Sequence, residues 1–454
     1  MSVAVFGGSG RCGSNSEQTI TTFATREGDR FSIIFSLFED LHLSAYKDIA
    51  EINPAARLLD LALRDGPIVK LPDGVLGIFD PTIALKVDKE NSHDLKVAES
   101  LADVLKLRKF SEPVGWREVR ALIAEQSGKL STPVHMKALY SRMRADLLAH
   151  RGEREDLTKL VWQMMSRTLI PLVIDNVDTR GASALVAEQE MRFRIQQTQQ
   201  ITFRQRFYDF KVLRASTRVI ARELKRRISD GDSHEDYAQS LLTLSKRIGV
   251  DRVTYLVTVQ LIAISGVPGM MAACLLYAFS RYPEWHERVR EETTALDEQE
   301  LYALPVRKLP CTMRFVKEAM RLWTTPFVTR RVASRDIDLE GVSVKKGETY
   351  ELSSYIQHHS PQIWDDPETF DPDRWLPSRR QATQNAYVPF GFAPRSCVGA
   401  SVGHAQLLLF CALMTRDFTF EFNGERRPRM RMDDGFAVPA DMTGTIAVVS
   451  EKIS

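Results

Sequence analysis

Residues 390–399 of the chain read FGFAPRSCVG, and a helical pattern, ASVGHAQLLLFCALMTRD, follows at once. Cys397 stands just before the start of this helix, where backbone N–H groups and the positive end of the helix dipole stabilise a thiolate. A thiolate is a soft metal ligand, and hydrogen bonds to its sulfur tune the metal that it binds. Arg395, two residues earlier, carries a charge that can hold a carboxylate. A single cysteine in a loop is more often a structural residue, so the assignment of a metal site depends on other parts of the chain.

Two patterns upstream place charged side chains where they can pair. Glu318 and Arg321 stand three residues apart in the helical stretch VKEAMRLW, so they share a helix face and can form an ion pair. Arg374 lies in FDPDRW, a turn constrained by proline. A carboxylate shared between two arginines forms a charge-assisted network, and such a network would fix the turn to the helix.

The patterns ExxR, FDPDRW and FGFAPRSCVG occur in the order and near the spacing found in the C-terminal half of cytochromes P450, and the chain resembles that family over roughly residues 45–454. Trp116 and Arg120 in VGWREVR match the family's WxxxR helix, and ISGVPGMMAACLLYAF resembles its long central helix. The resemblance implies a mainly α cytochrome P450 fold over residues 41–454, one large helical domain with small β-sheets. An irregular N-terminal extension over residues 1–40 would precede it.

The resemblance also implies roles for individual residues. Cys397 would be the thiolate ligand of heme b iron, and Glu318, Arg321 and Arg374 would form a structural triad that stabilises the heme-binding core. The residues implied to bind the cofactor besides Cys397 are Trp116, Arg120, Arg331, Phe390 and Arg395. Arg330 competes with its neighbour Arg331 for the propionate contact. His358 either lies near the same region or stabilises a helix or turn.

The central stretch departs from the family at its catalytic positions, which are Ser265, Gly266, Val267 and Pro268. The family usually carries an acid and an alcohol there, which deliver protons during oxygen activation. Counting back from Pro283 places Gly266 and Val267 at these two positions, and aligning on Ser265 and Gly266 as the family's small–Gly pair places residues 268 and 269 there, so neither alignment supplies the pair. Pro268 has no N–H and clashes with the preceding turn, so we expect it to kink the helix. The kink either enlarges a pocket or marks a different route for protons.

These features favour a heme-thiolate oxidoreductase, either a monooxygenase or an enzyme of oxidative coupling or cyclisation. It would act on a small, largely apolar organic molecule in specialised metabolism and take electrons from a ferredoxin- or flavodoxin-type donor. A peroxide-driven enzyme is one alternative. A non-redox isomerase or dehydratase, as some family members lacking the acid–alcohol pair are, is another, and a heme-binding protein without catalysis is the third.

Composition and charge agree with an ordinary globular protein. The 454 residues are 44% hydrophobic and 26% charged. The net charge is +2 and no long run of one sign occurs, so we do not expect a nucleic-acid partner. Five scattered cysteines without a CxxC pair favour a reducing compartment. The N-terminus lacks the pattern of a secretory signal. We therefore expect a cytoplasmic monomer that has no membrane anchor.

The uncharged stretch from Val253 to Phe279 is the one segment that resembles a membrane span, because it is long enough to cross a bilayer. A helix at the centre of a large soluble domain is also apolar on all sides. Gln260, Ser265 and the break GVPG at residues 266–269 favour this buried alternative.

Three local patterns give further expectations. The sequence GASVG at residues 399–403 matches the nucleophile elbow of hydrolases, but no strand pattern precedes it, so Ser401 should lie near the start of the last helix. The stretch GPIVKLPDGVLGIFDP predicts a hairpin that turns at residues 72–74. Ala393 replaces the family's usual glycine, which would cost on the order of 1 kcal/mol if the backbone there requires a positive φ.

Overall fold

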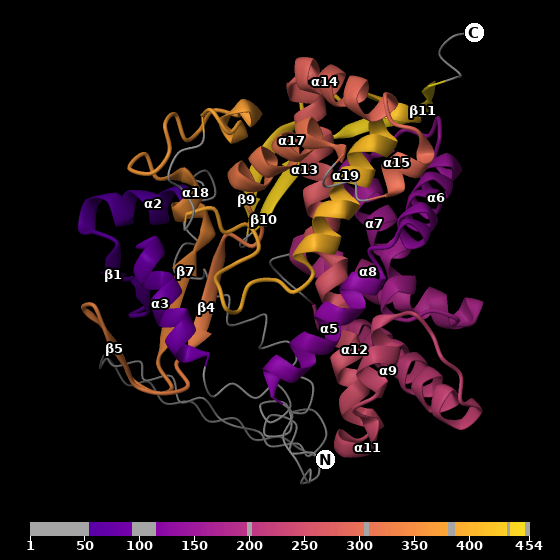
Figure 1. Cartoon of the computed structure of the whole chain (residues 1–454), viewed down its shortest axis with the longest axis horizontal. Coiled ribbons are helices and arrows are strands. Elements are labelled where there is room, and N and C mark those ends of the chain that lie inside the picture. The colour runs from indigo at the N-terminus through magenta and orange to yellow at the C-terminus, as the bar shows by residue number, and fades with distance from the viewer. Residues whose placement is uncertain are drawn as a thin grey trace, which may run out of the picture. The chain divides into compact units, whose positions relative to one another are not determined.

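The computed structural model describes residues 54–92, 115–197, 202–303, 308–379, 386–433 and 436–449, which belong to one compact unit, Leu41–Ser454. The extension predicted over residues 1–40, with Cys12, lies outside the described residues. The fold is mainly α, as the sequence predicts (Figure 1).

The helices are α2 (Pro54–Asp65), α3 (Pro81–Asn91), α5 (Trp116–Lys129), α6 (Pro133–Ala149), α7 (Leu157–Val173), α8 (Thr179–Gln197), α9 (Phe203–Asp230), α10 (Tyr237–Leu242), α11 (Ser245–Ile248), α12 (Val250–Ser265), α13 (Val267–Arg281), α14 (Pro283–Thr294), α15 (Glu298–Tyr302), α17 (Pro310–Leu322), α18 (Ser354–His359) and α19 (Ala400–Arg416). The strands are β1 (Ile68–Lys70), β2 (Leu76–Ile78), β3 (Glu155–Asp156), β4 (Val328–Val332), β5 (Ile337–Leu339), β6 (Val342–Val344), β7 (Thr349–Ser353), β8 (Phe418–Phe422), β9 (Arg429–Asp433), β10 (Phe436–Ala440) and β11 (Thr443–Val448).

The described strands pair into four small sheets, with orders β1-β2-β7-β4, β3-β11-β8, β10-β9 and β5-β6. The predicted hairpin is confirmed, because Ile68 of β1 pairs with Ile78 of β2 in antiparallel register. Gly74 in its turn has φ +86°, a value that favours glycine. β2 then pairs in parallel with β7, which joins the N-terminal hairpin to strands more than 250 residues later in the chain. In Figure 1 this sheet lies beside α2 and α3.

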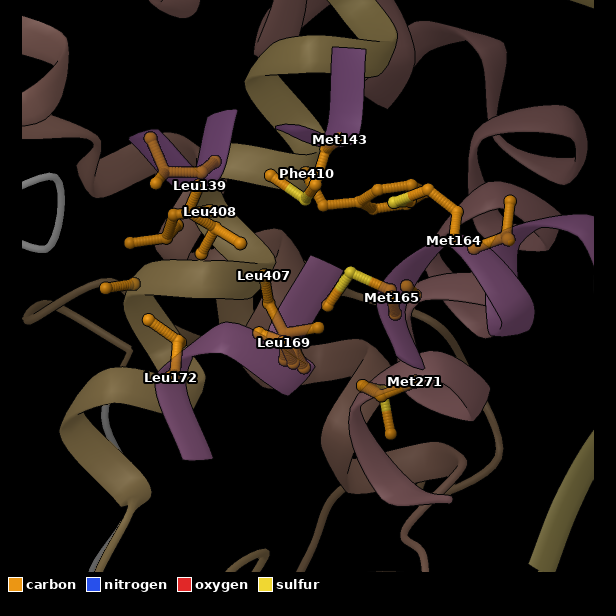
Figure 2. Packing of buried hydrophobic residues seen from close by; sticks show 14 of the residues in the cluster. Leu139, Met143, Met164, Met165, Leu169, Leu172, Met271, Leu407, Leu408 and Phe410 are labelled. Atoms are coloured by element: carbon orange, nitrogen blue, oxygen red, sulfur yellow. The ribbon is translucent and has the colours of Figure 1, made fainter. Parts of the chain in front are cut away.

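The main core lies between α6, α7, α13 and α19. Figure 2 shows Met143 of α6, Met164 and Met165 of α7 and Phe410 of α19 meeting in it, and each is 0% exposed. Methionine suits such a place because its flexible thioether fills irregular gaps. Since α19 is buried along most of its length, the position of its N-terminus, and of the Cys397 loop before it, is fixed by this core.

The long apolar helix is interrupted where the sequence predicts a kink. α12 ends at Ser265, α13 begins at Val267, and Gly266 between them has φ −107° and ψ −66°. The combined segment Val250–Arg281 has the length and hydropathy of a membrane span, and 59% of its most apolar window is buried inside the protein. Leu261 and Leu275 are both 0% exposed, which agrees with a central core helix.

Gly269 marks the closest approach between α13 and α7. A Cβ atom built there would lie 2.9 Å from Trp162 Cδ1 and 3.0 Å from both the Cα and the carbonyl oxygen of Trp162. Because two of these atoms belong to the backbone, they cannot move aside without shifting α7. We therefore expect Gly269→Ala to lower the free energy of unfolding by about 1–3 kcal/mol, measured by urea denaturation.

Gly128→Ala is the matched control for this substitution. Gly128 also lies in a helix, α5, but a Cβ atom added to it would have no heavy atom within 4 Å. The alanine there should raise the free energy of unfolding by up to about 1 kcal/mol through its effect on the unfolded chain. A similar gain from Gly269→Ala would contradict the close contact between α13 and α7.

Candidate heme-binding site

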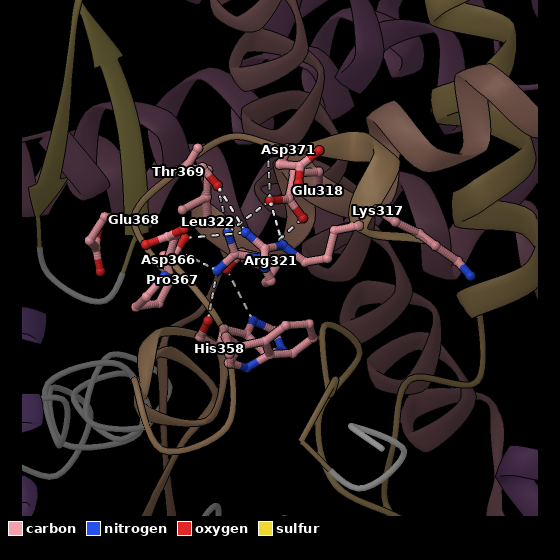
Figure 3. Close-up of polar contacts among 12 residues, drawn as sticks. Lys317, Glu318, Arg321, Leu322, His358, Asp366, Pro367, Glu368, Thr369 and Asp371 are labelled. Atoms are coloured by element: carbon pink, nitrogen blue, oxygen red, sulfur yellow. Dashed lines mark hydrogen bonds and ion pairs between the residues drawn. The ribbon is translucent and has the colours of Figure 1, made fainter. Parts of the chain in front are cut away.

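The triad predicted from ExxR and FDPDRW is assembled and buried around Glu318. Figure 3 shows Glu318 and Arg321 of this triad with the loop residues around them. Arg321 Nη2 lies 2.8 Å from Glu318 Oε1 and Arg321 Nε lies 3.1 Å from Oε2, a two-point pairing within α17. Arg374 Nε, from the short 3-10 helix Pro372–Trp375, lies 3.3 Å from the same Oε1. The shared carboxylate therefore fixes the turn to α17, as the sequence analysis expects.

The remaining donors of the two arginines hold the intervening loop. Arg321 Nη1 donates to the carbonyl oxygens of His358 (2.8 Å) and Pro367 (2.6 Å), and Arg374 Nη1 donates to that of Asp365 (2.6 Å). Trp375 Nε1 adds a hydrogen bond of 3.0 Å to Glu318 Oε2. Sequence reasoning gave Trp375 no role, although it is the last residue of FDPDRW. Its indole N–H is a second donor to the carboxylate oxygen that also accepts from Arg321 Nε.

His358 has the stabilising role rather than a cofactor contact. Its Nδ1 lies 3.1 Å from the carbonyl oxygen of Arg321, and its Nε2 accepts a hydrogen bond of 2.9 Å from the backbone N–H of Val388. Burial lowers the pKa of His358 well below its ordinary value, so the ring is neutral. It joins α18 to α17 and to the segment that leads into the Cys397 loop.

The Cys397 loop is closed by a hydrogen bond of 2.7 Å from the Cys397 N–H to the Phe390 carbonyl oxygen. The positive φ in this loop, +78°, falls on Gly391 and not on Ala393, so the cost considered for alanine does not arise. Ser401 lies exposed in the first turn of α19, and the described residues from 386 to 399 contain no strand. The hydrolase elbow is therefore excluded.

Cys397 is an exposed residue, whereas Cys274 and Cys411 are buried and Cys311 is half-buried. The surrounding protein raises the pKa of the Cys397 thiol by desolvation, and two groups oppose that change. The Gly399 backbone N–H hydrogen-bonds the sulfur, and the positive charge of Arg120 lies close enough to favour the thiolate. Both groups come from the elements that the sequence analysis connects with the cofactor.

The arginines predicted to bind propionate lie together. Arg331 Nε lies 3.3 Å and Arg395 Nη1 3.7 Å from the same carboxylate oxygen of Asp88, on α3. Burial and the charges of Arg331 and Arg120 lower the pKa of Arg395, so all three guanidinium groups share one region. The Arg120 guanidinium also lies 5.2 Å from the ring centroid of Trp116, whose indole N–H donates to the Ser92 carbonyl.

Arg330 faces a different set of residues. Its Nε lies 2.9 Å from Glu351 and its Nη2 lies 2.7 Å from Asp73, in the β1–β2 turn. Neighbouring residues of a strand point to opposite faces, so only one of Arg330 and Arg331 can join Arg395. The geometry favours Arg331 for the propionate contact.

The four predicted catalytic positions lie at the α12–α13 junction. Gly266 is buried, Pro268 is half-buried and Val267 is 37% exposed, while the side chain of Ser265 lies outside the description. Between residues 260 and 270, Gln260 is the sole described side chain with a hydrogen-bonding group. An acid–alcohol pair is therefore missing from this part of the helix, in agreement with the sequence.

Comparison with known proteins gives a family. The family model for cytochrome P450 matches residues 191–444, more than half of the chain. The chain is a cytochrome P450. Curated relatives of this P450 include pentalenene oxygenase of Streptomyces avermitilis, 34% identical over 159 residues, and a human ultra-long-chain fatty acid omega-hydroxylase, 31% identical over 163 residues. These matches cover 34% and 35% of the chain and 35% and 31% of the relatives, so the P450 is aligned with only about a third of their length.

Solved structures show the same fold over most of the P450. The heme domain of cytochrome P450DA matches with a TM-score of 0.67 at 16% identity, covering 88% of this chain and 94% of that one. A zebrafish cytochrome P450 with progesterone matches with a TM-score of 0.67 at 19% identity, covering 87% and 100% of the two chains.

Heme with cysteine-ligated iron is the cofactor of the P450 family, and the residues of this P450 fit it. Heme b carries two propionate carboxylates. The cluster contains three positive charges, on Arg120, Arg331 and Arg395, and one negative charge, on Asp88. Its net charge of +2 would balance the two propionate carboxylates. Cys397 is an exposed residue, and the charge of Arg120, one of these arginines, favours its thiolate. The individual roles of Cys397, Phe390 and Trp116 toward heme stay predictions.

Asp88 and Asn91 are the residues that the sequence analysis missed in this P450. They lie on the inner face of α3 with Ala84 and Val87, at the spacing of one helix face, and all four are 0% exposed. A charged residue within an apolar stripe is the signal that marks Asp88 in the sequence. No motif surrounds it, so the signal does not indicate its partners.

Proposed function

We propose that this P450 oxidises a small, largely apolar organic molecule and uses electrons from a ferredoxin- or flavodoxin-type donor. When bound, heme supplies the one-electron and dioxygen chemistry. The observation that carries the proposal is the exposed residue Cys397, with the charge of Arg120 acting on its sulfur, in a chain of the P450 family. The relatives named for acting on pentalenene and on fatty acids support an apolar substrate. We also propose that the enzyme is a cytoplasmic monomer and that it takes part in specialised metabolism.

The interrupted helix supports the second part of the proposal, which concerns protons. Ala263 of α12 and Val267 of α13 are exposed on the two sides of the break at Gly266, so an apolar face accompanies the break. This face offers contact to an apolar substrate but no proton donor. We infer that the protons needed for oxidation come from ordered water or from polar groups of the substrate itself.

The experiment compares three conditions on purified protein containing heme. A panel of terpene hydrocarbons and medium-chain fatty acids is first screened for shifts of the iron absorption spectrum, and each binder is then incubated with a ferredoxin and its reductase, with hydrogen peroxide, or with neither. We expect an oxygenated product that depends on the reductase. Product formed with peroxide alone would favour the peroxide-driven enzyme, and product formed with neither would contradict oxidation in favour of an isomerase or dehydratase.

A single substitution tests the route of protons. Val267→Thr keeps the shape of the side chain and adds a hydroxyl at the helix break. We expect it to raise the fraction of reducing equivalents recovered as product severalfold, because a donor is then present near the reacting centre. Val134→Thr, at a position that is 77% exposed on α6, is the control and should change nothing. An unchanged coupling ratio in Val267→Thr would contradict the inferred shortage of side-chain donors.

A further inference from the structure

Asp88 is a buried carboxylate among the arginines assigned to the heme propionates. It lies on α3 and is 0% exposed. Its Oδ1 accepts a hydrogen bond of 3.0 Å from the Tyr350 hydroxyl and lies 3.3 Å from Arg331 Nε and 3.7 Å from Arg395 Nη1. Its Oδ2 is buried and has no hydrogen-bond partner among the described residues. A buried carboxylate with one oxygen unsatisfied is costly, so its position calls for a specific cause.

The position of Asp88 is fixed by a second polar residue one helical turn later. Asn91 Nδ2 donates hydrogen bonds of 3.0 Å to the Tyr350 hydroxyl and to the Val332 carbonyl oxygen. Asn91 Oδ1 accepts a hydrogen bond of 2.7 Å from the Ser334 backbone N–H. These bonds fasten α3 to β4 and β7, the strands that carry Arg331 and Tyr350. The carboxylate is thereby held in one place relative to the arginines.

We propose that Asp88 is a positioning residue that orients Arg331 and Arg395 and sets the net charge of the propionate-binding cluster, and that it thereby lowers the reduction potential of the bound heme. The inference rests on the heme assignment of the proposed function. It concerns the ferric–ferrous equilibrium and not the substrate or the source of protons. An experiment can therefore contradict this inference without contradicting the proposed function.

Electrostatics gives the sign of the effect. Ferric heme carries one more positive charge than ferrous heme, and a nearby negative charge therefore stabilises the ferric form. Screening is weak inside a protein, so a buried charge acts over several ångströms beyond its direct contacts. Without the charge of Asp88, Arg120, Arg331 and Arg395 would face the two propionates with a net charge of +3, and the ferrous form would be favoured.

The chain offers a matched control on the other face of the same strands. Glu351 is 3% exposed and pairs with Arg330, the neighbour of Arg331, at 2.9 Å. Glu351→Gln removes a buried carboxylate from an arginine of β4, as Asp88→Asn does, but away from the arginine cluster. Tyr350→Phe removes the hydrogen bond to Asp88 and leaves its charge in place.

The experiment is a spectroelectrochemical redox titration of the heme-loaded variants without substrate. In Asp88→Asn we expect the ferrous-to-ferric ratio at a fixed potential to rise about tenfold, which is a positive shift of 59 mV for one electron. Glu351→Gln and Tyr350→Phe should change the ratio less than about threefold. In the double variant Asp88→Asn/Arg331→Gln the cluster returns to a net charge of +2, so the ratio should return toward that of the unmodified protein.

Each outcome bears on the proposal. Loss of heme from Asp88→Asn but not from the double variant would support it, because restored charge balance would have restored binding. No shift in Asp88→Asn, an equal shift in Glu351→Gln, or loss of heme from both Asp88→Asn and the double variant would overturn it. A missing shift together with normal turnover would leave the proposed function intact, whereas absence of heme from the unmodified protein would contradict both.

Discussion

Arg321→Met protein is expected to lose most of its stability and to retain little heme. The substitution removes a guanidinium that pairs with Glu318 at two points and leaves that carboxylate buried with Arg374 and Trp375 as its remaining side-chain partners. Breaking a buried ion pair on one side costs about 3–5 kcal/mol. The carbonyl oxygens of His358 and Pro367 lose their donor at the same time. Since domains are stable by only about 5–15 kcal/mol, the effect on urea unfolding and on the heme-to-protein ratio should be large.

Arg379→Gln is the control for Arg321→Met. Arg379 also pairs with an aspartate next to the triad, Asp371, at 2.7 Å, but its side chain is 53% exposed. An exposed pair of this kind contributes at most about 1 kcal/mol. Equal and small losses in the two variants would show that the Glu318 network does not hold the loop to α17.

The two halves of the triad could be predicted from the sequence because each half is local. Glu318 and Arg321 stand three residues apart on one helix face, and proline confines Arg374 to a turn. The contact that joins Glu318 to Arg374 spans 56 positions of the chain, so its prediction depends on the resemblance to the P450 family. The break at Gly266 is local for the same reason, since Pro268 disfavours the preceding turn wherever it stands in a helix. The hairpin at residues 68–78 depends on a turn of three residues.

The arginine cluster could be predicted only in part. Its members come from α5, β4 and the Cys397 loop, and two of them, Arg331 and Arg395, meet Asp88 of α3 across more than 240 positions of the chain. The sequence favoured Arg331 for the propionate contact but left Arg330 as a competing choice, because adjacent residues differ only in the face of the strand to which they point. That face is set by pairing with β7, a long-range feature. Asp88 was missed for the same reason, since a buried carboxylate acquires its role from partners far along the chain.

Cys397→Ser is expected to abolish the red-shifted reduced–CO band typical of the family while the protein still folds. The substitution replaces sulfur by oxygen in an exposed residue of a loop whose position is set by the buried helix α19 and by the Phe390 hydrogen bond. Serine is a far weaker ligand for iron than a thiolate, so oxidative activity should fall more than about 100-fold. Mutating a residue that only hydrogen-bonds a metal ligand typically costs about 10–100-fold, and loss of the ligand itself should cost more.

Cys311→Ser separates ligation from a general sensitivity to thiol loss. Cys311 lies half-buried on α17, four residues before Phe315 of the core and away from the arginine cluster, so its replacement should leave the band unchanged. Heme content gives a second distinction, because Arg120, Arg331, Arg395 and Asp88 are intact in Cys397→Ser and should still retain a fraction of the cofactor. A normal reduced–CO band in Cys397→Ser would remove Cys397 as the iron ligand. Because the red-shifted band reports a thiolate ligand, that result would assign the ligand to another cysteine of the chain.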